Sequence, residues 1–271
     1  MNAPEAKTHD WFSAVTWRRR AGTIALAVVV LTLWQIAVMT RKVPGYILPT
    51  PTAVVNALFN GIQARLYGPH VTATLSAMLI GYGIGAGTGV VVGGLLAEFR
   101  PLERTVFPYI VAIQSVPKIA LAPLFVMWLG YGLNSKVVMV ALICFFPMVV
   151  NTMTGIASAD RDRVDIVTTM TATRWQVFWH VRLPSAAGAI FAGLQVSVVL
   201  ALIGALVGEF VGSDAGLGNL IQASQASLDT AGMFAVLVIL AMIGIVATSL
   251  VRLAHRKVVF WETGARVTTE T

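Results

Sequence analysis

Long apolar stretches constrain this chain more than any other feature of its sequence. A helix needs about 20 apolar residues to cross the roughly 30 Å of hydrocarbon in a bilayer. The 271 residues are 57% hydrophobic and only 11% charged, whereas a soluble domain carries about 25% charged residues. We therefore expect an all-α, polytopic membrane protein with about six transmembrane helices. The six apolar stretches are residues 21–40, part of 71–99, about 105–129, about 135–155, from Pro184 to about 211, and 233–251.

The basic residues predict how these spans are oriented. With the N-terminus in the cytoplasm, 14 of the 19 Lys and Arg residues fall in inside segments and four fall outside. The inside set is Lys7, Arg18, Arg19, Arg20, Arg100, Arg104, Arg161, Arg163, Arg174, Arg182, Arg252, Arg256, Lys257 and Arg266. The outside set is Arg41, Lys42, Arg65 and Lys136, and Lys118 lies within a span. This bias predicts that both termini are cytoplasmic, and it explains the net charge of +7 without a nucleic-acid partner.

The orientation divides the chain into three parts. We expect a cytoplasmic N-terminal tail at 1–20, a transmembrane domain at 21–255 and a cytoplasmic C-terminal tail at 256–271. The first span is not expected to be a cleaved signal peptide, because its leading segment is long and no clear small-x-small site precedes Arg41.

The sequence lacks the motifs of an enzyme. No lysine follows a glycine, so the Gly-Lys-Ser/Thr of a phosphate-binding loop is absent. There is no Gly-x-Ser-x-Gly elbow and no His-Glu-x-x-His helix. The single cysteine, Cys144, excludes an intrachain disulfide and makes a metal cluster unexpected. We expect a non-catalytic chain that binds no cofactor and takes its energy from elsewhere.

The longest inside loop, Ser158 to Pro184, is too organised for a simple connector. A first short helix fits about 160–170. Thr173 and Gln176 then have the spacing of a capping box, which predicts the start of a second helix. Pro184 suits the entry into the fifth span, because proline cannot donate a backbone hydrogen bond.

Three aromatic residues lie on one face of the second helix. Trp175, Phe178 and Trp179 are three and four residues apart, which is the spacing of neighbours on a helix surface. They could anchor the loop at the lipid–water interface, where tryptophan is common, or they could contact a partner protein.

The loop resembles the cytoplasmic EAA loop of ABC importer permeases. Asp165 and the following Ile-Val occupy the Glu-Ala-Ala positions, Thr171 stands where that family has glycine, and Leu183 and Pro184 match its Leu-Pro. In that family the loop forms coupling helices that dock on the ATPase subunit. A glycine there usually supplies a left-handed turn. With Thr171, either the turn is built differently or the docking absorbs the strain.

Three further segments resemble permeases of the nitrate, sulfonate and taurine group, at 45–58, 115–152 and 208–221. The resemblance implies a type I importer permease fold in the bacterial cytoplasmic membrane. It also implies a homodimer, two ATPase subunits that bind ATP and Mg²⁺, and a soluble solute-binding protein. The implied solute is a small anion such as a sulfonate, taurine or nitrate, or a heterocyclic precursor. The alternative is a self-sufficient secondary carrier or channel, for which few ionisable residues lie inside the spans.

Three residues are candidates for the solute path. Lys118 lies well inside the third span, and Gln114 is one helical turn before it. Lys118 could attract an anion, or it could pair with a carbonyl where Pro117 interrupts the helix. Glu209, near the outer end of the fifth span, could gate the path or cap the glycine-rich turn that follows.

Small and polar residues within the spans are expected to serve helix packing. Asn151 in the fourth span is expected to bond to a neighbouring helix. The second span carries five glycines that we expect at helix contacts, namely Gly81, Gly83, Gly85, Gly87 and Gly89.

Overall fold

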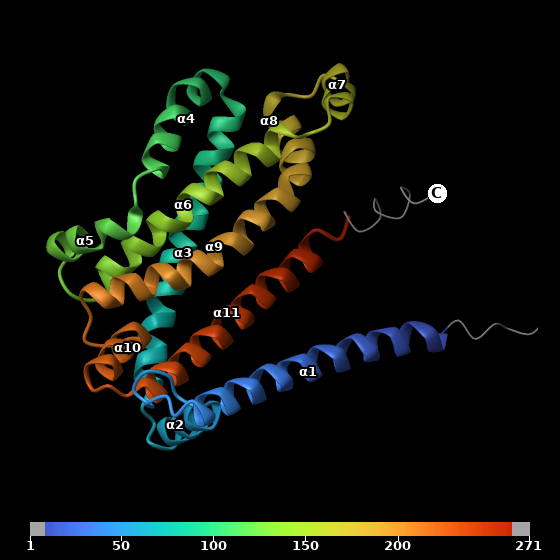
Figure 1. The fold of residues 1–271 in the computed structure, drawn as a ribbon. Helices are drawn as coiled ribbons and strands as arrows, with labels where there is room; N and C mark the ends of the chain where they lie inside the picture. The colour runs from blue at the N-terminus through green and yellow to red at the C-terminus, as the bar shows by residue number, and fades with distance from the viewer. Residues whose placement is uncertain (1–8, 262–271) are drawn as a thin grey trace, which may run out of the picture. The chain divides into compact units, whose positions relative to one another are not determined.

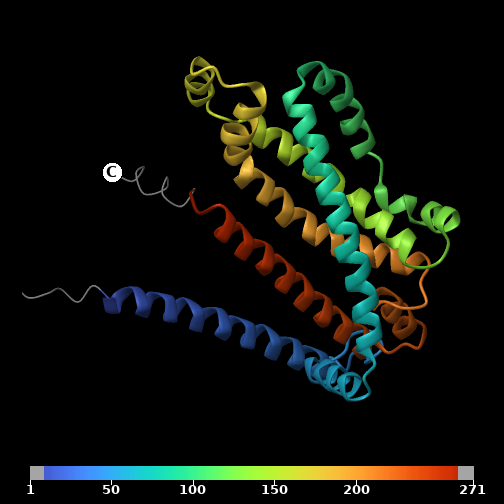
Figure 2. The same cartoon turned by 180° about the vertical axis from the view of Figure 1, so that it is seen from behind.

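A computed structural model describes residues 9–261, and every regular element in this range is helical (Figure 1 and, from behind, Figure 2). Five of the helices are long and apolar enough to cross a membrane. A bent pair of helices makes a sixth span if the pair is counted as one. The prediction of an all-α polytopic chain with about six spans is therefore confirmed.

The chain divides into two compact units. The first comprises residues 1–64 and 224–235, and the second comprises 65–223 and 236–271. The first unit contains α1 (His9–Thr40) and α2 (Pro51–Gln63). Helix α1 thus begins before the expected boundary at residue 21. Residues 1–8 and 262–271 of the two predicted tails lie outside the described part of the chain.

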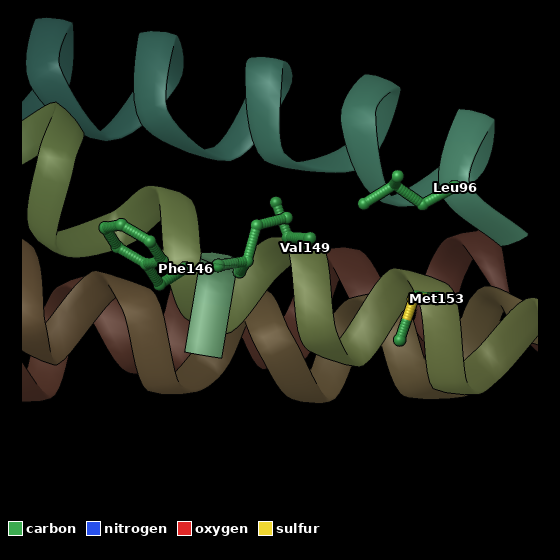
Figure 3. Close-up of a cluster of buried hydrophobic side chains, with 5 residues drawn as sticks. Leu96, Phe146, Val149 and Met153 are labelled. Atoms are coloured by element: carbon green, nitrogen blue, oxygen red, sulfur yellow. The ribbon is translucent and has the colours of Figure 1, made fainter. Parts of the chain in front are cut away.

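The core of the second unit consists of α3 (Tyr67–Glu98), α6 (Leu133–Ala157) and α9 (Leu183–Val211). These helices are the second, fourth and fifth predicted spans. Helix α6 packs along both α3 and α9. The close-up in Figure 3 shows one apolar cluster of this core, with Leu96 on α3 facing Phe146, Val149 and Met153 on α6.

Glycines allow α3 and α6 to approach closely. A Cβ atom on Gly81, Gly85 or Gly89 would lie 2.4–2.5 Å from the nearest atom of α6, so only glycine fits at these positions. The expectation for Gly83 and Gly87 is wrong within this chain, because nothing lies within 4 Å of a Cβ at either position. The contact face repeats every four residues, so the two intervening glycines point away from α6.

The third predicted span is not one straight helix. Helix α4 (Arg100–Gln114) is followed by a 3₁₀ turn (Lys118–Leu121) and α5 (Ala122–Leu129). The two halves meet at an angle of 80°. Pro117 is the last residue before the 3₁₀ turn, and the residue that precedes a proline is disfavoured in the helical conformation, so the helix ends here.

The remaining helices lie in the loop region and near the C-terminus. Helix α7 (Arg161–Thr169), helix α8 (Arg174–Val177) and a π-helical turn (Phe178–Arg182) precede α9. Helix α10 (Leu217–Ala226) and helix α11 (Thr230–Val258) follow it. Helix α11 covers the sixth predicted span.

Candidate functional site

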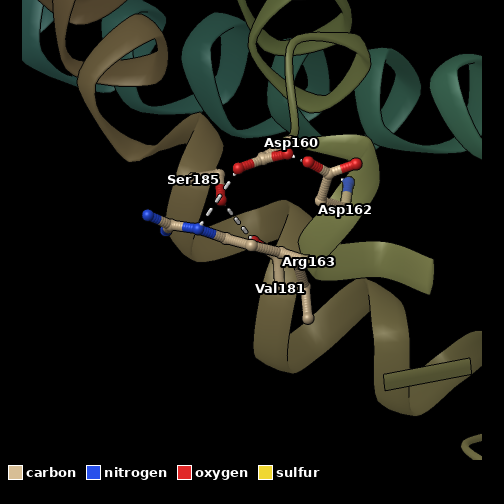
Figure 4. Close-up of polar contacts among 5 residues, drawn as sticks. All are labelled: Asp160, Asp162, Arg163, Val181 and Ser185. Atoms are coloured by element: carbon tan, nitrogen blue, oxygen red, sulfur yellow. Dashed lines mark hydrogen bonds and ion pairs between the residues drawn. The ribbon is translucent and has the colours of Figure 1, made fainter. Parts of the chain in front are cut away.

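The loop between α6 and α9 begins with a capped helix. Asp160 is the N-cap of α7, and its Oδ1 accepts a 3.0 Å hydrogen bond from the Asp162 amide. Its other carboxylate oxygen lies 3.5 Å from Nε of Arg163. Figure 4 shows these contacts beside the start of α9, where Ser185 donates to the Val181 carbonyl. The first predicted loop helix is confirmed.

The turn after α7 is left-handed and is built around Thr171, whose φ is 64°. The Thr171 amide donates to the Thr168 carbonyl (3.0 Å), and the Ala172 amide donates to the Val167 carbonyl (3.3 Å). These two bonds form a Schellman motif, which usually has glycine at its left-handed position. The turn geometry is therefore retained, and a non-glycine residue adopts it at a cost of about 1–2 kcal/mol.

The predicted capping box begins the second loop helix. The Thr173 amide donates to Gln176 Oε1 (2.8 Å), and the Gln176 amide donates to Thr173 Oγ1 (3.4 Å). Both bonds satisfy amides that have no partner within the helix.

The second loop helix runs into the membrane span without a break, and Pro184 lies at the start of α9, where we expected the entry into the fifth span. Helix α8, the π turn and α9 form one helical segment, residues 174–211. In the π turn the Leu183 amide donates to the Phe178 carbonyl, five residues earlier. The wider turn directly precedes Pro184, which cannot donate, so the proline is accommodated within a continuous helix.

The three aromatic side chains of this segment have different environments. Trp175 and Trp179 are 61% and 58% exposed, while Phe178 is half-buried between them, with ring centroids 6.0 and 5.5 Å away. A Cβ on Gly94 of α3 would lie 3.8 Å from the Phe178 ring. Phe178 therefore packs towards its own spans, and the two tryptophans face outwards.

The remaining loop positions complete an exposed apolar surface. Ile166 on α7 is 60% exposed, and Met170, directly after this helix, is 75% exposed. Asp165 is also exposed. We name Ile166, Met170, Trp175 and Trp179 the coupling surface. An ion pair fixes the base of the loop, since Arg182 Nη1 lies 2.8 Å from Glu98 Oε2 at the end of α3.

Lys118 lies at the break in the third span. Its Nζ donates to the Gln114 carbonyl (2.9 Å) and lies 4.8 Å from the centroid of the Phe146 ring. The side chain of Gln114 does not form this bond, which the backbone makes. Lys118 is half-buried, so its ammonium group bridges the break and stays partly accessible.

Glu209 lies near the C-terminal end of α9 and is 1% exposed. Its carboxylate accepts 2.7 Å hydrogen bonds from the Thr74 hydroxyl and from the Gly218 amide at the start of α10. These are the contacts of a cap on the glycine-rich turn. A Cβ on Gly216 would lie 2.2 Å from the carboxyl carbon, and the φ of Gly216 is 139°, so glycine is required there.

Three residues of this network, Thr74, Lys136 and His70, were not found from the sequence. Lys136, which we counted only as a basic residue of an outside segment, is 5% exposed, and its Nζ donates to Ser213 Oγ (2.7 Å) and the Ala215 carbonyl (3.3 Å). His70 Nδ1 contacts the backbone of Gly216. A histidine one turn before a threonine at the start of an apolar helix was the available signal for His70 and Thr74. Asn151 bonds to the Pro147 carbonyl of its own helix (2.8 Å), not to a neighbouring one.

These features define a class of protein: a multi-pass helical membrane chain with a structured, partly apolar loop between its spans. The chain matches the family described as "Binding-protein-dependent transport system inner membrane component" over residues 85–260. It belongs to this family, and is therefore the non-catalytic permease of an ABC importer and a multi-pass protein of the inner membrane. Membership decides against a self-sufficient carrier, and no cofactor is expected for such a chain.

Three relatives are named for different solutes. The riboflavin transport system permease protein RibX of Chloroflexus aurantiacus is 37% identical over 86% of this chain and 87% of its own length. The formylaminopyrimidine transport permease protein ThiX of Halalkalibacterium halodurans is 34% identical, with coverage of 86% and 92%. A putative aliphatic sulfonates transport permease protein, SsuC of Bacillus subtilis, is 30% identical, with coverage of 95% and 90%.

A solved structure shares the fold. The membrane chain of an inward-facing MetNI methionine ABC transporter superposes with a TM-score of 0.59 and is 21% identical. The match covers 70% of this chain and 93% of that chain.

Proposed function

We propose that the loop from Ser158 to Pro184 is the docking surface for an ATPase subunit. In the complete importer, two copies of this chain pair with two ATPase subunits and a soluble solute-binding protein. Both termini are cytoplasmic in this arrangement. The observation that carries the proposal is the coupling surface, four large apolar side chains exposed on a loop whose helices are individually capped.

An ATPase subunit can move the spans only through a rigid contact with this chain. The capping box, the Schellman turn and the Arg182–Glu98 ion pair each restrict the loop. Helix α8 is continuous with α9, so a force applied at Trp175 or Trp179 is transmitted along the fifth span. Asp165 is exposed beside these anchors and offers a charge to an Arg or Lys of the ATPase subunit.

Pull-down of the ATPase subunit tests the docking surface. Truncating a buried interface tryptophan costs about 2 kcal/mol or more, so Trp175→Ala and Trp179→Ala should each weaken binding by about 30-fold. Asp165→Ala should weaken it less. Trp128→Ala is the matched control, because Trp128 is 66% exposed on α5, outside the loop. If both loop variants retain the subunit as well as Trp128→Ala does, at equal membrane yield, the tryptophans are interfacial anchors and the proposal fails.

A planar nitrogen heterocycle is the solute class best supported. The relatives named for riboflavin and formylaminopyrimidine are 37% and 34% identical, against 30% for the sulfonate permease. A small anion such as a sulfonate, taurine or nitrate is the second candidate. It is favoured by the accessible ammonium group of Lys118 at the break in the third span, with Gln114 beside it. Glu209 supports neither, because both of its oxygens are already bonded.

Uptake into proteoliposomes distinguishes the two solute classes. The permease is reconstituted with its ATPase subunit and binding protein, and ATP-dependent uptake of riboflavin, formylaminopyrimidine and taurine is compared. We expect accumulation of a heterocycle. Uptake of taurine alone would overturn the heterocycle assignment and leave the docking surface unaffected.

A further inference from the structure

We propose that the end of α1, the start of α2 and the turn before α11 form a binding site for a phospholipid whose headgroup carries a phosphate and an ammonium group. A groove of about 580 Å³ lies there within the first unit. Its lining includes the aliphatic side chains of Val38, Met39 and Leu48 together with Lys42 and Asp229. We assign the site to the outer leaflet, and only this assignment rests on the proposed topology.

The groove has the polarity of a phospholipid along the axis of α1. Val38 and Met39 lie in the last turn of this span, which ends at Thr40, and Lys42 follows with a left-handed φ of 49°. Only 6% of the apolar window of α1 is buried within the chain, so this span presents apolar surface to the hydrocarbon of a bilayer up to the turn that lines the groove. Apolar groups thus lie on the hydrocarbon side and charged groups on the water side. A soluble binding protein could reach only the charged end.

The charged residues suit a zwitterionic headgroup. Lys42 is exposed, and its ammonium group makes no hydrogen bond or ion pair with residues 9–261. Asp229 uses Oδ1 to accept a 2.9 Å bond from the Gly232 amide at the start of α11, and its Oδ2 has no partner among the described residues. A phosphate can accept from Lys42 while an ammonium group donates to Asp229. Phosphatidylethanolamine carries both groups.

Helix α2 gives a second observation that this region lies at the membrane boundary. Val55, Phe59 and Ile62 are 63%, 59% and 59% exposed and follow one another at i, i+4 and i+7, so they form one apolar strip. Asn56 and Asn60 are exposed beside this strip. A short helix with adjacent apolar and polar strips is typical of one that lies in the plane of the interface.

Lipid titration of the purified importer, followed by native mass spectrometry, tests the site. We expect phosphatidylethanolamine to bind about tenfold more tightly than phosphatidylglycerol or phosphatidylcholine, the equivalent of one charge-assisted hydrogen bond. Lys42→Gln loses the contact with the phosphate that all three lipids share and should weaken phosphatidylethanolamine binding by about this factor, whereas Arg41→Gln, a neighbouring cation that does not line the groove, should not. Asp229→Asn keeps an oxygen to cap Gly232 and should abolish the preference over phosphatidylglycerol.

Nitroxide labels on α2 provide the second measurement. Cys144 is fully buried, so Phe59→Cys and Asn60→Cys each introduce one reactive thiol. In liposomes the label at 59 should be accessible to oxygen and the label at 60 to an aqueous nickel complex. Equal lipid binding by the Lys42 and Arg41 variants would overturn the proposal. So would immobilisation of the label at 59 by added binding protein, since this face would then be a protein interface. Neither result affects ATPase docking, whose residues lie in another loop.

Discussion

The carboxylate of Glu209 on α9 accepts a 2.7 Å hydrogen bond from the hydroxyl of Thr74 on α3, 135 residues away in sequence. The same hydroxyl accepts a 2.9 Å bond from the Leu217 amide, and the other carboxylate oxygen accepts from Gly218. Two core helices and the start of α10 are therefore joined by one buried polar network. This end of the core is held by directional bonds, whereas Figure 3 shows that apolar packing joins α3 and α6 elsewhere.

Thr74→Val should destabilise the protein, because valine has the shape of threonine and lacks the hydroxyl. The change leaves a carboxylate oxygen of Glu209 and the Leu217 amide without partners. A buried unpaired group costs about 1–3 kcal/mol. We expect a lower midpoint of thermal unfolding in detergent. Thr88→Val on the same helix is the control, because the Thr88 hydroxyl bonds only to carbonyls of its own helix. Equal midpoints for the two variants would contradict the network's role.

Gly85→Ala should also destabilise the protein, by separating α3 from α6. The new Cβ would lie 2.4 Å from the Ala141 carbonyl oxygen, and overpacking of this kind costs about 1–3 kcal/mol. Gly83→Ala is two residues away and adds its Cβ to open space. Thermal unfolding of the two variants should differ in midpoint by several degrees. Loss of stability in Gly83→Ala alone would show that the packing face has been assigned wrongly.

Thr171→Gly should stabilise the loop between α6 and α9. Glycine adopts the left-handed conformation without the cost of about 1–2 kcal/mol that a side chain incurs. Part of this gain is lost to the greater freedom of glycine in the unfolded turn, which leaves about 0.5–1 kcal/mol. Hydrogen exchange of the Ala172 amide, which bonds to Val167, should slow by about two- to fivefold.

Thr171→Ala is the control for this prediction, because it removes the hydroxyl and keeps the backbone strain. Exchange of the Ala172 amide in this variant should remain close to that of the wild type. If the glycine and alanine variants exchange equally fast, the turn is not strained at residue 171.

Local features of the loop between α6 and α9 could be predicted from the sequence. The capping box needs only Thr173 and Gln176, three residues apart, and its two bonds are present. The first loop helix is likewise local, with Asp160 as its cap. Such features depend on neighbours in the chain, so the residues that make them can be read directly.

Features that depend on distant partners could not be predicted. Pro117 indicated an interruption within residues 105–129, but an apolar stretch reports length and hydropathy and not direction, so the 80° bend could not be predicted. When a helix is apolar on all sides, its sequence pattern does not indicate which face packs against a neighbour. For this reason Gly83 and Gly87 were grouped with Gly85. The partner of Glu209 is Thr74, and nothing in the local sequence of either residue indicates the other.

Removing the charge of Lys118 should impair transport more than it impairs folding. Lys118→Met keeps most of the aliphatic stem near Phe146 and loses the ammonium group that bonds to the Gln114 carbonyl. If that group attracts the solute, uptake should fall by about tenfold or more, the equivalent of about 1.4 kcal/mol. Stimulation of the ATPase by the binding protein should persist, because the coupling surface is unchanged.

Lys118→Arg keeps the charge and should restore part of the uptake. The measurement is uptake, ATPase rate and thermal midpoint in the same proteoliposome preparations. Wild-type uptake by Lys118→Met at equal protein content would show that the ammonium group only bridges the break in the third span.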